Sequence, residues 1–246
     1  HSFRQRPAAD VHVGPPRRHT AAVGVVMGKK RQAPTRKTLR GSRGRSHSKQ
    51  VKPLVVLAVE GATEKQYLNA LNQHLYGRAF SFTFCRNNSK SSLKNLVEIM
   101  GGKVKELERD SISISGAWII CDVDVNEPHR AILKRWLSEK TDFHHGAALS
   151  NPCIEAWFVY HCADVCSSQT ASAVVEELVS KWERGAYEKA MEISQWLIDH
   201  TDEACLRVQR RRESFARGTT AWDDAPWSDM PELVAWLDQL RPRRSE

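Results

Sequence analysis

The chain has 246 residues, of which 41% are hydrophobic, so it can bury one substantial core but not several domains. Its formal charge of +8 is unevenly spread, because residues 1–52 contain fourteen basic residues and one acid, which is +13 and leaves −5 for the rest. The composition therefore excludes a uniformly basic nucleic-acid-binding domain, although a basic arm can contact phosphates without sequence preference.

Residues 1–52 are rich in Arg, Lys, Pro, Gly and Ser and offer almost no apolar side chains to bury, which predicts a disordered basic arm. Met27 is interpreted as the natural start, with residues 1–26 upstream of it. The six cysteines show no paired C-x-x-C spacing, and no apolar run reaches the roughly 20 residues of a membrane helix. We expect reduced thiols, a cytoplasmic location and no membrane partner.

Short apolar runs alternate with amphipathic segments from Pro53 onward. Thr63 and Gln66 have the spacing of a capping box, and Asn126 and Pro128 have the pattern of a helix start. The expected strands are 54–59, 80–85, 117–121 and 146–149. A first helix is expected after Thr63 and another after Asn151. The other expected helices are 92–109, 126–139, 170–182, 186–199, 202–216 and 231–240.

This alternation predicts an α/β fold with a mostly parallel sheet flanked by helices, whose ligand sites lie beyond the C-terminal ends of the strands. We expect an α/β domain at 53–163 and a C-terminal helical extension at 164–246.

Carboxylates follow two of the predicted strands. Glu60 and Glu64 come after the first, and Asp122 and Asp124 come after the third. Each pair alone could be a helix cap or a solvated loop, but together they place four carboxylates at one sheet edge. They would repel one another unless cations lie between them, and hard oxygen ligands suit Mg²⁺ or Mn²⁺. Two such ions could activate water and stabilise the charge on a phosphodiester undergoing displacement.

Three segments carry a specific resemblance, namely VEGATEKQYL (59–68), CDVDVN (121–126) and SNPCIEAWFVYH (150–161). Together with the basic lead-in they resemble the RloB-like (AbiLii-like) family of phage-defence proteins with a Toprim domain, over about residues 40–162. The resemblance implies a Toprim/Rossmann-like sheet that binds Mg²⁺ through Glu60, Asp122 and Asp124 as catalytic residues. It also implies that Glu64 and Glu155 complete the metal site.

The third segment allows two interpretations. The resemblance places Asn151 and His161 beside the metal site, whereas a helix cap for Asn151 and core packing for Trp157 and His161 explain the same residues. Glu155 favours the site, because a first-turn acid after the next strand lies at the same sheet edge. The family's Asn-Pro-Ser-Thr segment has only a partial counterpart at 225–237, so Ser228 and Asp229 receive no role.

Basic residues form a second candidate site. The run RVQRRRE (207–213) could contact nucleic-acid phosphates or form a solvated helix face. Further cations predicted near the acidic edge are Lys90, Lys94, Arg130 and Lys134. The candidate nucleic-acid-binding residues in the run are Arg207, Arg210, Arg211 and Arg212.

The carboxylates predict a Mg²⁺-dependent nuclease, and the resemblance implies that it belongs to a bacterial antiphage or abortive-infection system. Because no G-x-x-x-x-G-K-[ST] loop is present, ATP hydrolysis would require a separate subunit, and the resemblance implies an ATPase of the AAA or ABC type. The alternatives are a nucleotide hydrolase or transferase, and a non-catalytic partner of such an ATPase.

Overall fold

The computed structural model describes residues 51–87, 92–123, 127–182 and 185–242. The predicted arm at 1–52 lies almost entirely outside them, as do Lys90, Asp124 and Asn126. The described residues belong to one compact unit.

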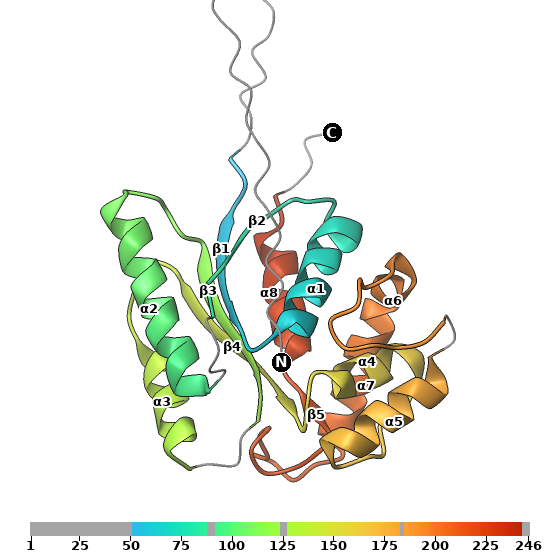
Figure 1. Cartoon of the computed structure of the whole chain (residues 1–246). Coiled ribbons are helices and arrows are strands. Elements are labelled where there is room, and N and C mark those ends of the chain that lie inside the picture. The colour runs from blue at the N-terminus through green and yellow to red at the C-terminus, as the bar shows by residue number, and fades with distance from the viewer. Residues whose placement is uncertain (1–50, 88–91, 124–126, 183–184, 243–246) are drawn as a thin grey trace, which may run out of the picture. The chain divides into compact units, whose positions relative to one another are not determined.

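A five-stranded sheet forms the centre of the described part of the chain (Figure 1). Its strands are β1 (Leu54–Val59), β2 (Ser81–Phe84), β3 (Gly116–Asp122), β4 (His144–Asn151) and β5 (Trp227–Ser228). They lie in the order β2-β1-β3-β4-β5, with β1 to β4 parallel and β5 antiparallel to β4. The predicted mixed α/β fold with a mostly parallel sheet is confirmed.

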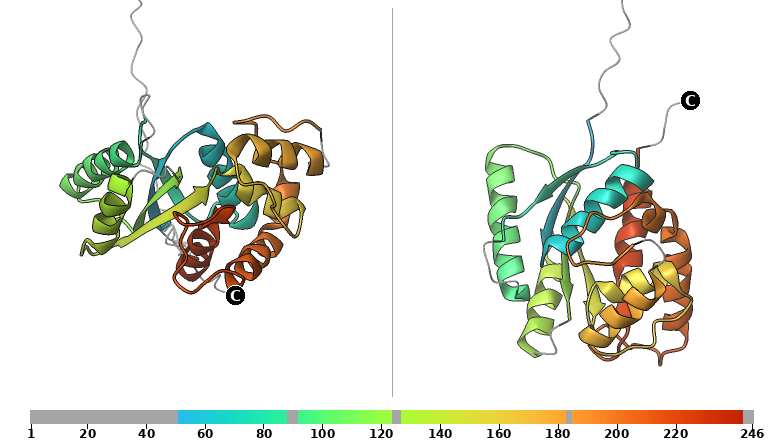
Figure 2. Two further views of the ribbon diagram at one scale, coloured as in Figure 1. Left: turned by 90° about the horizontal axis from the view of Figure 1, so that it is seen from below. Right: turned by 45° about the vertical axis from the view of Figure 1, so that its right-hand side comes forward.

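The sheet is covered on both faces, which explains the continuous apolar runs in its central strands. Alternate residues such as Val56 and Ile119 pack under α2 (Leu93–Arg109) and α3 (Glu127–Ser138). Their neighbours, including Val55 and Trp118, pack in the second core with α1 (Ala62–Ala70) and α8 (Met230–Leu240). Figure 2 shows the sheet between these two layers.

The remaining helices pack in the same core as α1 and α8. None of the helices in the described ranges has the length and apolar character that crossing a membrane requires. These remaining elements are η1 (Leu71–Leu75), a π-helical turn that continues α1, and the helices α4 (Glu155–Cys162), α5 (Ala171–Lys181), α6 (Gln195–Asp199) and α7 (Thr201–Glu213).

The predicted capping box at the start of α1 is wrong. The helix begins at Ala62 behind Gly61, and the Glu64 carboxylate accepts a hydrogen bond from the Gly61 N–H at 2.9 Å. The Thr63 hydroxyl oxygen accepts instead from the backbone N–H of Ala190, at 3.0 Å. Thr63 therefore ties the start of α1 to the loop before α6.

Two parts of the predicted helical extension also differ. The helix expected at 186–199 is present only as α6, and the segment before α6 is irregular, with positive φ at Ala190 and at the preceding Gly185. The short strand β5 was not predicted, because two residues carry no periodicity. It pairs Ser228 with Ser150, so the C-terminal part of the chain returns to the edge of the sheet.

Candidate functional site

Four carboxylates gather beyond the C-terminal ends of β1 and β3. Glu60 directly follows β1 and Asp122 ends β3, and because these strands are neighbours the two residues meet. The Asp122 N–H donates to Glu60 Oε2 at 2.9 Å. Glu64 lies in the first turn of α1, and Glu155 is the first residue of α4. The structure therefore brings together every predicted metal ligand that it describes.

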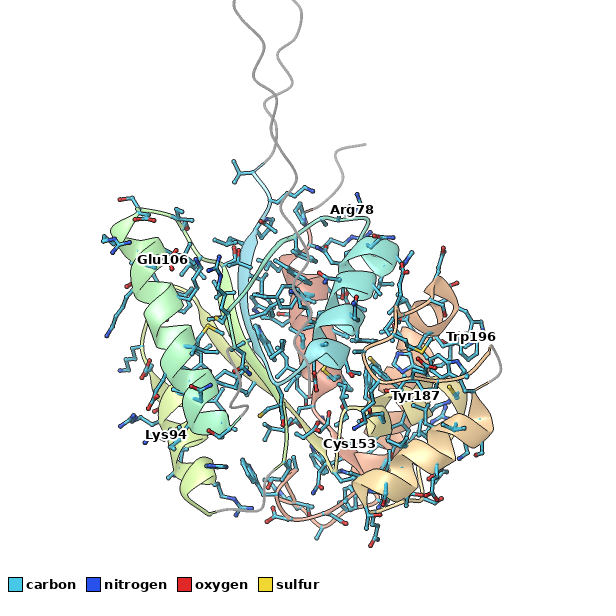
Figure 3. The ribbon with its side chains drawn as sticks, viewed as in Figure 1. Arg78, Lys94, Glu106, Cys153, Tyr187 and Trp196 are labelled. Atoms are coloured by element: carbon cyan, nitrogen blue, oxygen red, sulfur yellow. The ribbon has the colours of Figure 1, made fainter. Side chains whose placement is uncertain are left out.

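Glu64 and Glu155 are almost completely buried, at 5% and 2% exposure. Glu155 Oε1 accepts a hydrogen bond from the Tyr187 hydroxyl at 2.9 Å and lies 3.7 Å from the Lys189 ammonium. Both partners belong to the irregular segment before α6. Figure 3 shows Tyr187 and Cys153 on the side of the sheet opposite Lys94 and Glu106 of α2.

The electrostatics of these acids reflect burial and mutual repulsion. Burial raises the pKa of Asp122 to about 8, and the negative charges of Glu60, Glu64 and Glu155 add to the rise. Burial is also the largest cause of the raised pKa of Glu64, to which Glu60 and Glu155 contribute. The cluster therefore favours bound protons or cations over four separate negative charges.

The donor chemistry of the cluster fits a hard divalent cation. Carboxylate oxygens are the ligands that Mg²⁺ and Mn²⁺ prefer, and Asp122 Oδ1 is buried without a hydrogen-bond partner. Within the described ranges, no three His, Cys, Asp or Glu side chains stand in a geometry that could hold an ion as they are. Glu60, Glu64 and Glu155 each direct one oxygen at a protein donor, and Asp124 lies outside the described residues.

The two residues predicted to support the site have structural contacts. The Asn151 side-chain amide donates to the carbonyl oxygens of Ala221 and Asp224, at 2.8 and 2.9 Å. The His161 ring is buried, with Nδ1 2.9 Å from the Trp157 carbonyl oxygen and Nε2 3.4 Å from the Tyr67 hydroxyl. Burial lowers the pKa of His161 to about 3. His161 is therefore a packing residue of the core. Asn151 holds the loop before β5 through its side-chain amide.

The arginines of α7 are mostly engaged inside the protein. Arg207 pairs with Asp164 at 2.8 Å and donates to the carbonyl oxygens of Tyr160 and His161. Arg212 pairs with Asp229 at 2.8 Å and with Glu232. These contacts make Arg207 and Arg212 structural, which counts against their predicted phosphate contacts.

The other predicted cations differ in their surroundings. Arg211 lies over the Phe215 ring at 4.1 Å, and Arg210 is exposed. Lys94 lies 4.0 Å from Glu98 on an exposed face of α2. Arg130 pairs with Asp223 at 2.8 Å, and Lys134 is exposed one turn further along α3.

Three residues were not identified from the sequence: Tyr187 and Lys189 contact Glu155, and Asp229 lies beside the end of β4. Tyr187 and Lys189 fell in a segment predicted as helix, and no motif marked them. Asp229 was left without a role, yet its N–H donates to the Leu149 carbonyl oxygen at 2.8 Å, beside the end of β4. Burial raises the pKa of Asp229 to about 6. The partial resemblance at 225–237 was the only signal for it.

The fold and this edge define a mostly parallel α/β protein with an acidic site at the C-terminal ends of its strands. The model of the RloB-like protein family matches residues 55–237, which include all of the sheet except Leu54 and all four described carboxylates. The chain belongs to the RloB-like family. No match was found among curated protein sequences.

Proposed function

We propose that the protein is a metal-dependent nuclease that hydrolyses phosphodiester bonds at the carboxylate cluster. The observation that carries the proposal is the convergence of Glu60, Glu64, Asp122 and Glu155 at one sheet edge, with Asp122 Oδ1 buried and unpaired. Four acids in mutual repulsion are costly unless a cation compensates them. Hydrolysis of phosphodiesters is a reaction that such cations promote, by activating water and stabilising the charge that develops at phosphorus.

Each acid has a part in this proposal. Glu60 and Asp122 would hold the ion directly, together with Asp124, while Glu64 and Glu155 complete its surroundings. Bound Mg²⁺ or Mn²⁺ would supply charge neutralisation at the phosphate and a water of lowered pKa. The hydrogen bond from Tyr187 orients Glu155. Lys189, whose side chain is 67% exposed, can approach a substrate phosphate from the same side.

The wider role that we propose is antiphage defence, with which membership of the RloB-like family is compatible. The fourteen basic residues of the segment 1–52 would attract nucleic acid without sequence preference. A separate ATPase subunit of the AAA or ABC type would supply nucleotide-driven control.

The test is cleavage of DNA, RNA and tRNA by the full chain with Mg²⁺ or Mn²⁺. Asp122→Asn keeps the shape of the side chain and removes its charge, so we expect cleavage to fall by about 100-fold or more, as for loss of a metal ligand. Asp110→Asn, an exposed acid at the end of α2, is the matched control and should cleave like wild type. Equal activity of wild type and Asp122→Asn would contradict the proposal.

A nucleotide hydrolase or transferase is the second candidate. The charge of −5 on residues 53–246 favours it, because an acidic surface repels a long polyanion more than a mononucleotide. Turnover of mononucleotides without cleavage of any polynucleotide would select this function.

A further inference from the structure

A pocket of about 520 Å³ lies between α3 and the loop before β5, apart from the carboxylates themselves. Its apolar walls include Leu133, Leu137, Leu149 and the indole of Trp222. Leu137, which lines the pocket, is 46% exposed. In Figure 1, α3 and the chain leading into β5 both lie at the lower edge of the sheet. The volume falls within the range of small-ligand sites.

Two cations stand on the α3 side of this pocket. The Arg130 guanidinium lies 5.8 Å from the centre of the Trp222 ring and pairs with Asp223 at 2.8 Å, so it fixes the loop against the helix. Lys134 lines the pocket one turn further on and makes no ion pair with any residue that the structure describes. The pocket therefore combines a flat aromatic wall with two cations, and its one lining carboxylate among the described residues, Asp229, pairs with Arg212.

The pocket is tied to the same sheet edge as the carboxylates. Asn151, which follows Ser150 at the end of β4, donates to the carbonyl oxygens of Ala221 and Asp224 on either side of Trp222 and Asp223. Ser150 in turn is the partner of Asp122 across the β3–β4 pairing. A ligand in the pocket would therefore lie near the end of β4, the strand next to the one that ends in Asp122.

We propose that this pocket binds one nucleotide, with its base against Trp222 and its phosphate at Lys134. Aromatic side chains bind bases through stacking, which tolerates any sequence, and a lysine provides a point charge for phosphate. A purely apolar peptide segment would offer Lys134 no negatively charged group, so the lysine favours an anionic ligand. The proposal rests on the proposed function and adds a nucleotide subsite to it, because Asn151 at the end of β4 holds the loop that carries Trp222 at the same sheet edge as the acids.

The experiment measures binding by the full chain in EDTA, so that no divalent cation contributes. The probes are AMP, adenosine and ribose 5-phosphate, with a five-nucleotide single strand as competitor. We expect AMP to bind more tightly than either fragment. Trp222→Ala should weaken AMP by about 5-fold to 100-fold, the measured range for loss of one stacked base. Lys134→Glu should weaken AMP but leave adenosine unchanged.

Controls separate this site from the metal centre. Lys94→Glu, on the exposed face of α2, should bind AMP like wild type. Asp122→Asn should also keep AMP binding in EDTA, so a loss of cleavage and a loss of nucleotide binding are distinguishable. Circular dichroism checks that each variant is folded. If Trp222→Ala does not fold, Lys134→Glu still tests the proposal, because Lys134 is at an exposed helix position.

If the single strand displaces AMP, the ligand is one nucleotide of a polynucleotide. If the single strand does not displace AMP, the ligand is a free nucleotide. Both results support a nucleotide site in this pocket. The proposal is overturned if ribose 5-phosphate binds as well as AMP, or if Trp222→Ala and Lys134→Glu both bind AMP like wild type. Binding of an apolar dye that AMP does not displace would also overturn it, in favour of an apolar partner.

Discussion

Buried ionisable side chains are the most informative residues of this protein. Asp122 and His161 are both removed from water, but burial acts on them in opposite directions because it always disfavours the charged form. The pKa of Asp122 rises to about 8 and that of His161 falls to about 3. Asp122 has an unpaired oxygen and charged neighbours, whereas His161 has protein contacts at both ring nitrogens. The first arrangement favours a ligand and the second favours packing.

His161 predicts a specific loss of stability in acid. In the unfolded chain the imidazole has a pKa near 6.5, whereas in the folded protein its pKa is about 3. Between these two pH values the unfolded chain binds a proton that the folded protein does not bind. The free energy of unfolding therefore declines as the pH falls from 6.5 to 3. At pH 5 the contribution is about 2 kcal/mol. Urea unfolding at pH 7 and pH 5 should show a smaller decline in His161→Phe than in wild type.

Tyr67→Phe is the control, because it removes the hydroxyl near His161 but leaves the buried imidazole in place. It should retain the wild-type decline between pH 7 and pH 5. An equal decline in His161→Phe and wild type would show that another group is responsible.

At the scale of elements, the close approach of β3 and β4 depends on small residues beside large rings. A Cβ at Gly146 would lie 2.3 Å from ring atoms of Trp118, and one at Gly116 would lie 2.5 Å from Trp236. Trp118 is 3% exposed and also packs against Trp236, with ring centres 5.6 Å apart, so it has little room to move. Gly146 is therefore required by packing.

Gly146→Ala should lower the free energy of unfolding by about 1–3 kcal/mol, the usual cost of overpacking a core. Gly102→Ala provides a matched comparison of opposite sign, since nothing lies within 4 Å of its Cβ position on α2. It should stabilise the protein by about 0.5–1 kcal/mol through helix propensity. Urea unfolding of wild type and both variants measures these changes in the free energy of unfolding. A Gly146→Ala variant as stable as wild type would contradict the tight β3–β4 packing.

Elements with long apolar patterns could be predicted from the sequence. The run at 54–59 became β1 without a change of boundary, and the helix expected at 92–109 became α2, with Ser92 as its N-cap. The segment 186–194 could not be predicted, because its conformation depends on contacts with Thr63 and Glu155 that are distant in sequence. The strand β5 depends in the same way on pairing with β4.

At the scale of the molecule, the acidic site is a product of topology. Residues separated by up to 95 positions, from Glu60 to Glu155, meet because parallel strands end at one edge. That rule allowed their convergence to be predicted from the order of strands alone. The contributions of Tyr187 and Lys189 could not be predicted, because both residues belong to an irregular segment that reaches the edge only in the folded chain.

The convergence of the carboxylates has one direct test, which is calorimetric titration of the full chain with Mn²⁺. Wild type should bind the ion, Asp122→Asn should bind it at least about tenfold more weakly, and Asp110→Asn should match wild type. The absence of Mn²⁺ binding to wild type, or equal affinities of wild type and Asp122→Asn, would contradict a metal centre at the ends of β1 and β3.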